Sequence, residues 1–293
     1  MPQRFGSAHT SNKLDKLERY LTTYSTALKN QDFRLIFFDA FAGTGQIQVS
    51  EAAPLLESIT EYGPFIIGST ERALQLGKAF DEYIFVERSA QKVQRLAELK
   101  KKYPNVADRV SIAQGDANSE LQRFALQTDW RKCRAVVFLD PFGNDVEWRT
   151  IEAIALTKAV DLWYLFPAGL GVHRQIGRDG TIHYTHGPSL DRMLGTTEWR
   201  TAFVEEVVEP DLFAGTRKRT TKVATPRSVT EFMIKRMRTI FGGGVLDIWL
   251  PLGHRNIHMY SLIFAWANPG EKAKLAGKLA EAVLRAKERG RFK

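Results

Sequence analysis

The sequence has little cysteine and no long apolar run. Its 293 residues include a single cysteine, Cys133, which excludes an internal disulfide and a cysteine-rich metal site. No window of about 18 residues is apolar throughout, so the sequence predicts no membrane span and no membrane partner. The first residues contain no apolar stretch typical of a secretory leader. We therefore expect a cytoplasmic protein.

Three common functional motifs are also missing. The turn D-A-F-A-G-T-G at 39–45 lacks the Gly-Lys-Ser/Thr ending of a phosphate-binding P-loop. It also lacks the G-x-G-x-x-G spacing of dinucleotide-binding proteins. No G-x-S-x-G nucleophile turn occurs in the chain. These absences argue against a nucleoside triphosphatase, a nicotinamide-dependent dehydrogenase and a serine hydrolase.

The sequence does carry an excess of basic residues. Lysine and arginine number 42 and aspartate and glutamate 33, for a net charge of +9. A basic surface favours polyanions, above all nucleic acid, although a solvated basic face is the alternative. We predict that region 190–242 is a mostly helical, basic elaboration within a single domain, 1–293. Its predicted nucleic-acid-binding residues are Arg217, Lys218, Arg219, Lys222, Lys235 and Arg236.

Apolar runs of strand length alternate with helical patterns over residues 34–167. Strands buried on both faces are apolar throughout, which indicates a parallel sheet with helices on either side. Two later apolar runs, 242–253 and 258–270, are separated by a short link and predict an antiparallel hairpin. The pattern predicts a Rossmann-like α/β fold of the class I methyltransferase type. Its sheet is expected to be mostly parallel and seven-stranded, with a C-terminal antiparallel hairpin and helical insertions.

The turn at 39–45 matches the D-x-x-x-G-x-G pattern of enzymes that use S-adenosyl-L-methionine. Gly43 and Gly45 would let the backbone approach the cofactor, because glycine tolerates positive φ and has no side chain. Asp39, at the end of the first strand, is positioned to hold the cationic amino group of the methionine part. Phe41 lies in the same turn. A tight turn without a ligand is the alternative.

Acidic residues also end the next two strands. Glu87 is suited to accept hydrogen bonds from both ribose hydroxyls, as the ribose-binding acid of dinucleotide folds does. Asp116 is suited to accept from the adenine amino group, with Ala117 packed near the ring. Arg88 completes the predicted cofactor site. A solvated strand-end carboxylate is commonplace, but three acids on three successive strand tips indicate a shared ligand.

The fourth strand ends in F-L-D-P-F-G, which resembles the D-P-P-Y motif of amino-methyltransferases. We predict that Asp140, Pro141 and Phe142 form the catalytic motif, with the acid and a backbone carbonyl accepting hydrogen bonds from a target amine. Phe142 stands where the second proline is expected, and Gly143 where the aromatic is expected. Alternatively, Asp140 contacts the cofactor or caps the following helix, and Phe142 belongs to the core.

The segments FFDAFAGTG, GSTERAL, FVER, FLDPFG, LFP and DRMLGTTEW together resemble the three-Cys-motif partner family, TcmP, from about residue 12 to residue 268. The resemblance implies a bacterial protein with a class I methyltransferase fold. It also implies a partner: a radical-SAM-like protein with three cysteines. It implies no named reaction.

Two long connections, 46–68 and 168–190, are expected to be functional. The second contains His173, His183 and His186, whose spacing matches no known zinc site, so we expect a polar substrate loop and no metal. His183 or His186 is a candidate general base. The sequence favours a methyltransferase acting on nucleic acid. The alternatives are a cofactor-binding partner subunit without methyl transfer and a nucleic-acid-processing enzyme on the same fold.

Overall fold

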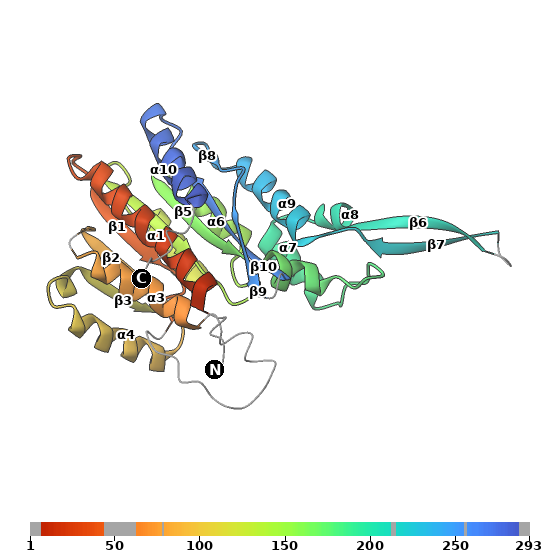
Figure 1. The fold of residues 1–293 in the computed structure, drawn as a ribbon, viewed down its shortest axis with the longest axis horizontal. Helices are drawn as coiled ribbons and strands as arrows, with labels where there is room; N and C mark the ends of the chain where they lie inside the picture. Colours follow the sequence, from red (N-terminus) through yellow and green to blue (C-terminus); the bar gives the residue numbers. More distant parts are fainter. Residues whose placement is uncertain (1–6, 44–62, 78, 212–214, 255–256, 287–293) are drawn as a thin grey trace.

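A computed structural model describes residues 7–43, 63–77, 79–211, 215–254 and 257–286 (Figure 1). In this part of the chain, no helix combines the length and the apolar character that crossing a membrane requires. The fold is built around one sheet, and a separate two-stranded ribbon projects from it.

Five parallel strands form the centre of the sheet in the order β3-β2-β1-β4-β5. An antiparallel strand, β10, pairs with β5, and both β8 and β9 pair with β10. The strands are β1 Arg34–Asp39, β2 Glu82–Glu87, β3 Val110–Gln114, β4 Cys133–Leu139, β5 Val160–Phe166, β8 Gly244–Val245, β9 Leu250–His254 and β10 Ile257–Trp266.

This strand order, with an antiparallel strand beside β5, is that of the class I methyltransferase fold and confirms the predicted fold class. Within the described residues the sheet has eight strands rather than seven, because the apolar run 242–253 is divided into β8 and β9. The predicted antiparallel hairpin is formed by β9 and β10.

Helices cover both faces of the sheet, because successive strand residues point to opposite sides. In β1, Leu35 and Phe37 pack in the core on one side, and Ile36 and Phe38 pack on the other. The first side is covered by α1 Ser7–Leu28, α3 Gly63–Gln75, α4 Ala90–Lys102 and α10 Lys274–Arg285. The second is covered by α5 Ala117–Gln127, α6 Trp148–Leu156, α7 His186–Leu194, α8 Trp199–Phe203 and α9 Pro226–Arg238.

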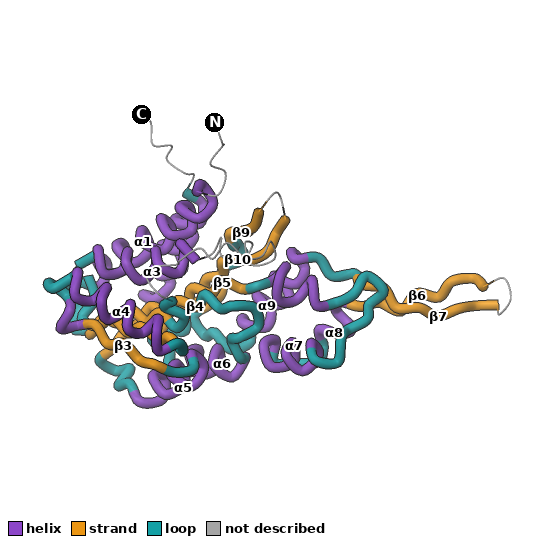
Figure 2. Tube along the Cα trace, turned by 90° about the horizontal axis from the view of Figure 1, so that it is seen from below, coloured by secondary structure: helices purple, strands orange, loops and turns teal. Residues whose placement is uncertain are grey.

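The prediction that region 190–242 is mostly helical is wrong for residues 204–211 and 215–222. There, β6 Val204–Asp211 and β7 Gly215–Lys222 form an antiparallel ribbon outside the main sheet. Valine recurs in β6 and threonine in β7, and these β-branched residues favour extended backbone. The ribbon projects away from the body beyond α7 and α8 (Figures 1 and 2).

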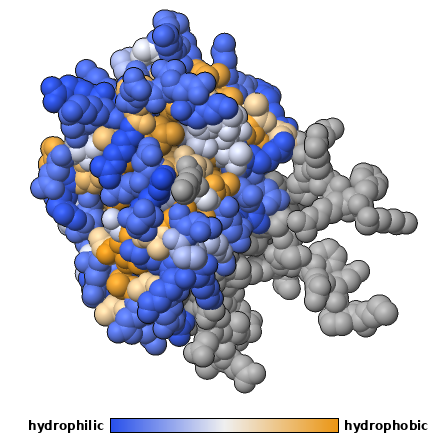
Figure 3. Space-filling view, turned by 90° about the vertical axis from the view of Figure 1, so that its left-hand side faces the viewer, coloured by the Kyte–Doolittle hydropathy of each residue, from blue (hydrophilic) through white to orange (hydrophobic). Residues whose placement is uncertain are grey.

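The opposite end of the molecule, near α4 and β3, carries mostly hydrophilic residues with smaller hydrophobic areas among them (Figure 3). Segment 168–190 is more structured than predicted. It contains a wide helical turn at Ala168–Val172, a short helix at His173–Gln175 and the start of α7. The described part of segment 46–68 likewise belongs to α3, which begins at Gly63.

Candidate functional site

A cleft of about 630 Å³ lies at the carboxyl ends of the parallel strands. Phe41 reaches it from the turn after β1, Glu87 from the end of β2, Asp116 from the turn after β3 and Phe142 from the turn after β4. Open α/β sheets bind their ligands at this edge. The cleft also contains the predicted Arg88 and Ala117, and residues that the sequence did not indicate: Lys92, Asn118, Asn144, Asp145, Glu147, Gln175, Ser189 and Arg192.

Glu87 is held in a defined position at this cleft. Its side chain is only 8% exposed, and Oε1 accepts a hydrogen bond of 2.8 Å from the backbone N–H of Ser89. Oε2 lies 3.8 Å from the ammonium of Lys92. The carboxylate is therefore oriented before any ligand binds, and it suits a ligand that offers hydroxyl donors.

Asp116 forms the N-cap of α5, which fixes its side chain at the cleft. Its Oδ1 accepts hydrogen bonds from the backbone N–H of Ser119 at 3.0 Å and from the Ser119 hydroxyl at 3.2 Å. The structure shows no hydrogen bond to Oδ2 from any residue that it describes. One oxygen thus orients the carboxylate, and the other is left to accept from a ligand.

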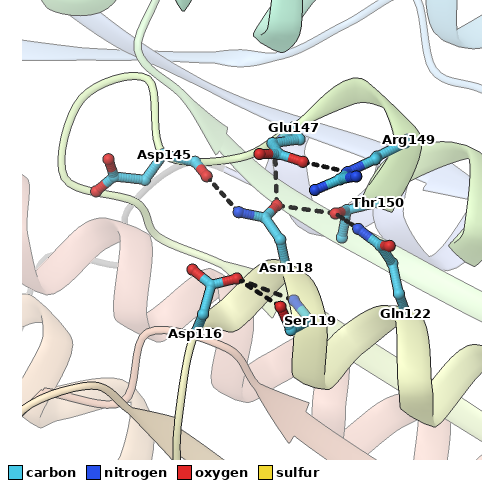
Figure 4. Close-up of polar contacts among 8 residues, drawn as sticks. All are labelled: Asp116, Asn118, Ser119, Gln122, Asp145, Glu147, Arg149 and Thr150. Atoms are coloured by element: carbon cyan, nitrogen blue, oxygen red, sulfur yellow. Dashed lines mark hydrogen bonds and ion pairs between the residues drawn. The ribbon is translucent and has the colours of Figure 1, made fainter.

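Asn118 fastens the turn after β4 to α5 (Figure 4). Its Nδ2 donates to the carbonyl of Asp145 at 2.7 Å, and its Oδ1 accepts from the backbone N–H of Glu147 at 2.9 Å. Oδ1 also accepts from the Thr150 hydroxyl at 2.8 Å, which in turn accepts from Gln122 at 2.9 Å. This buried network determines where the turn 140–147 lies relative to the cleft.

Replacing Asn118 with alanine should lower the free energy of unfolding by roughly 2–3 kcal/mol. The change leaves the N–H of Glu147 and the carbonyl of Asp145 without their partners. Urea denaturation followed by circular dichroism measures the effect. Gln127→Ala, at an exposed position near the end of the same helix, is the control and should change the value by less than about 0.5 kcal/mol. Equal stabilities of the two variants would contradict this role of Asn118.

The predicted catalytic motif is divided between the cleft and the interior. Phe142 is 44% exposed, lines the cleft and has the ammonium of Lys92 5.4 Å from its ring centroid. Asp140 is 5% exposed, Pro141 is also buried, and neither lines the cleft. The aromatic ring is the part of the motif that a ligand in the cleft would meet first.

Asp145 adds a second carboxyl group beside Asp116. Burial raises the pKa of Asp145, and the charge of Asp116 raises it further, whereas Arg88 acts in the opposite direction. The cleft therefore combines closely spaced acidic groups with basic side chains. This composition suits a polar ligand with hydrogen-bond donors better than a simple anion.

Asp39 does not line the cleft, so its predicted contact with the methionine amino group has no support in the geometry. It is fully buried and accepts from the Ser69 hydroxyl at 2.9 Å and from the backbone N–H of Phe41 at 3.1 Å. The Thr70 hydroxyl lies 3.4 Å from Asp39 and 3.2 Å from the carbonyl of Ala42. Burial raises the pKa of Asp39 to about 7. Asp39 thus attaches the turn to α3.

The glycine turn itself is described only in part. Gly43 has a φ of +67°, the left-handed conformation that the sequence pattern predicts. Gly45 and the segment 44–62 lie outside the described residues. The backbone N–H of Ala42 donates to the carbonyl of Val86 at 3.0 Å, which continues the β1–β2 pairing up to the cleft.

The predicted nucleic-acid-binding residues occupy different environments. Arg217, Lys218 and Arg219 are exposed on β7. Lys222 instead donates from Nζ to the carbonyls of His173 at 3.2 Å and Ile176 at 3.0 Å. Burial, and to a lesser degree Arg178, lower its pKa. Lys222 thus anchors the ribbon to the body, and its predicted contact with nucleic acid stays a prediction.

The two predicted residues on α9 also differ from each other. Lys235 is exposed. Arg236 donates to the carbonyl of Leu194 at 3.3 Å and to that of Gly195 at 2.9 Å, and its guanidinium lies 4.6 Å from the ring of Trp148. A cation at these carbonyls stabilises the C-terminal end of α7. Arg236 therefore has a structural role at the end of α7, and its predicted contact with nucleic acid stays a prediction.

The three histidines of segment 168–190 do not line the cleft. The rings of His183 and His186 are 5.4 Å apart, and Nδ1 of His183 lies 2.7 Å from the Thr185 hydroxyl. Burial lowers the pKa of His173. No group of three metal-binding side chains occurs in the described segments. The geometry offers no support for His183 or His186 as a general base acting in the cleft.

The sequence matches no protein-family model and no curated protein. Among solved structures, protein LPL1258 from Legionella pneumophila aligns over 92% of this chain and 91% of its own, with 13% identity and a TM-score of 0.47. Magnesium protoporphyrin IX methyltransferase (ChlM) from Synechocystis, solved with bound SAM, aligns over 76% and 86%, with 10% identity and a TM-score of 0.33. Spermidine synthase from Thermotoga maritima aligns over 96% and 72%, with 9% identity and a TM-score of 0.39.

Likenesses this distant assign no function to individual residues. The strand order and the position of the cleft define the class: this is a protein with the class I methyltransferase fold.

Proposed function

We propose that the protein is an S-adenosyl-L-methionine-dependent methyltransferase that modifies an amino group of a nucleic acid. One observation carries the proposal. The turns after β2, β3 and β4 bring Glu87, Asp116 and Phe142 into a single cleft at the carboxyl edge of the sheet.

The residues of the cleft fit this cofactor. Its ribose and adenine offer hydroxyl and amino donors, and the Glu87 carboxylate and Oδ2 of Asp116 are matching acceptors. Ala117 is small and lines the cleft, which leaves room for a flat ring beside Asp116. When bound, S-adenosyl-L-methionine supplies an electrophilic methyl group.

The turn after β4 would receive the target. Phe142 presents an exposed ring on which a base can stack, and such stacking contributes about 1–3 kcal/mol per base. Asp140, two residues earlier, is buried and does not itself line the cleft, so the proposal requires the target amine to reach past Phe142 to this carboxylate, which would then accept a hydrogen bond and direct the nitrogen lone pair. The Asn118 network holds this turn in place. The protein's main contribution is then proximity and alignment.

Calorimetric titration with S-adenosyl-L-methionine and S-adenosylhomocysteine tests the first half of the proposal, with NAD and ATP as controls. Selective micromolar binding would support it, and transfer of a tritiated methyl group to DNA, RNA or protein would then identify the substrate. Binding without transfer to any of them would favour a cofactor-binding subunit of a three-Cys-motif partner protein. No binding would refute the proposal.

Replacing Glu87 with alanine should weaken cofactor binding by roughly 1.5–3 kcal/mol, or about 10- to 150-fold, because hydrogen bonds to a charged group are lost. The same titration measures the change. Glu98→Ala, which removes an exposed carboxylate from α4, is the matched control and should leave the affinity unaltered. If the Glu87 variant retains wild-type affinity, Glu87 does not contact the ribose.

A further inference from the structure

A second hollow, separate from the cleft, lies along the β6–β7 ribbon. This groove of about 670 Å³ runs between β7 and the turn at 178–181. Arg178, Arg217, Lys218 and Arg219 line it, and threonine hydroxyls lie between them. All four basic side chains are exposed. The groove is therefore a basic channel on the surface.

The side chains that line the groove carry an excess of positive charge. Four basic and two acidic side chains line it, for a net charge of +2. Of the acids, Asp179 accepts from the Thr181 hydroxyl at 2.7 Å, and Glu206 pairs with Lys218 at 2.8 Å. The remaining acidic residues of the ribbon belong to β6, where Glu209 stands opposite Arg217 in the register, whereas its basic residues belong to β7. A polyanion would accordingly lie along β7.

Hydrogen bonds hold the turn at 178–181 against β7 and so fix the shape of the groove. The Thr220 hydroxyl donates to the carbonyl of Asp179 at 2.7 Å, and the backbone N–H of Lys222 donates to the carbonyl of Arg178 at 3.1 Å. Gly180 has a φ of +78°, and a Cβ there would lie 2.6 Å from Val204 Cγ1. The turn thus packs directly against the ribbon, so the groove is preformed.

The groove and the cleft are separate hollows whose lining residues come close together along the chain. Gln175 lines the cleft and Arg178 lines the groove, and three residues span at most about 10 Å. From Thr221 to Arg217, β7 adds about 14 Å. The groove along β7 alone is therefore about four times as long as one nucleotide at about 3.4 Å per stacked unit, and the connection to the cleft adds at most about 10 Å.

We propose that this groove binds the phosphodiester backbone of the nucleic acid whose base enters the cleft. The inference rests on the proposed function and specifies its substrate as a polymer held at two places. Arg217 and Arg219 repeat on one face of β7 about every 6.8 Å, which suits a chain with charges at regular intervals. Such contacts supply affinity and register without sequence choice.

Fluorescence anisotropy tests the groove with three labelled probes: a 20-nucleotide DNA strand, an RNA strand of the same sequence and the corresponding DNA duplex. The variant is Arg217→Gln/Lys218→Gln/Arg219→Gln. The control is Lys101→Gln/Lys102→Gln/Lys278→Gln, which removes three exposed cations from α4 and α10. These helices lie away from the ribbon (Figure 1).

The ribbon variant should bind the preferred probe at least about tenfold more weakly at low salt. Its plot of log affinity against log salt should be shallower by about 2, because each lost phosphate contact contributes about 0.7–0.9 to the slope. The control should stay within about twofold of wild type. The probe bound most tightly identifies DNA or RNA and single or double strand.

Two outcomes would overturn the inference: equal losses in both variants, or displacement of the probe by a polyglutamate peptide of equal charge at equal concentration. Failure of the proposed function is distinguishable. If the probe binds through the ribbon but no methyl group is transferred, the proposed nucleic-acid-binding groove is supported and the proposed methyltransferase activity is refuted. If the ribbon variant transfers methyl groups to nucleic acid as fast as wild type does, the proposed methyltransferase activity is supported and the proposed role of the groove is refuted.

Discussion

Asp140→Asn should reduce the rate of methyl transfer at least about 100-fold while leaving cofactor affinity within about threefold of wild type. The carboxylate stands at the end of β4 and is 5% exposed. In the proposed reaction it accepts a hydrogen bond from the target amine and stabilises the positive charge that develops on nitrogen. Losing one such preorganised group commonly costs 10²–10³ in rate.

Single-turnover transfer of a tritiated methyl group, with calorimetry on the same preparation, separates rate from binding. Asp129→Asn is the control, because this exposed acid precedes β4 at the opposite edge of the sheet. Phe142→Leu provides a second comparison and should raise KM more than it lowers kcat, since stacking holds the base. Full activity of Asp140→Asn would remove this residue from the reaction.

The contribution of Asp161 to the stability of the protein should decline as the pH rises from about 4 to 8. Asp161 lies on β5, is 7% exposed, and its Oδ2 accepts a hydrogen bond of 2.7 Å from the hydroxyl of Tyr20 on α1. Burial raises its pKa to about 7, although the Tyr20 hydrogen bond and Arg134 act in the opposite direction.

The sign follows from proton binding. Between the unfolded pKa of about 3.9 and the folded pKa, the folded state holds a proton that the unfolded state has lost. This contribution to stability is complete below the unfolded pKa and is lost as the pH rises through about 7. Buried Asp39, whose pKa is also raised to about 7, acts in the same direction.

Asp161→Asn removes one of these two titrations and retains an oxygen that can accept from Tyr20. The free energy of unfolding of Asp161→Asn, taken relative to that of wild type, should therefore increase by on the order of 3 kcal/mol between pH 4.5 and pH 8. Urea denaturation at both pH values measures this difference. In Tyr20→Phe the carboxyl loses its donor, so that variant should keep or steepen the wild-type dependence. Parallel pH profiles for Asp161→Asn and wild type would contradict the prediction.

The candidate site was only partly predictable from the sequence. Glu87 and Asp116 were found because parallel strands end at a common edge, so residues that end successive apolar runs meet there. Asn118, Gln175 and Arg192 were not indicated, since they enter the cleft from helices and from a connection after β5. Polar residues in such segments have no pattern that distinguishes a cleft from solvent.

The sequence by itself determined the fold class. Strands buried on both faces require continuous apolar runs. Such runs consist of consecutive residues, so they can be recognised in the sequence without knowing any distant contact. Only the tertiary structure decided which polar groups face the cleft. It buried Asp39 against Ser69, placed Lys222 and Arg236 on backbone carbonyls, and paired residues 204–211 with 215–222 in a ribbon. The physical reason is that a polar side chain takes whichever partner folding brings within hydrogen-bond distance, and those partners are distant in sequence.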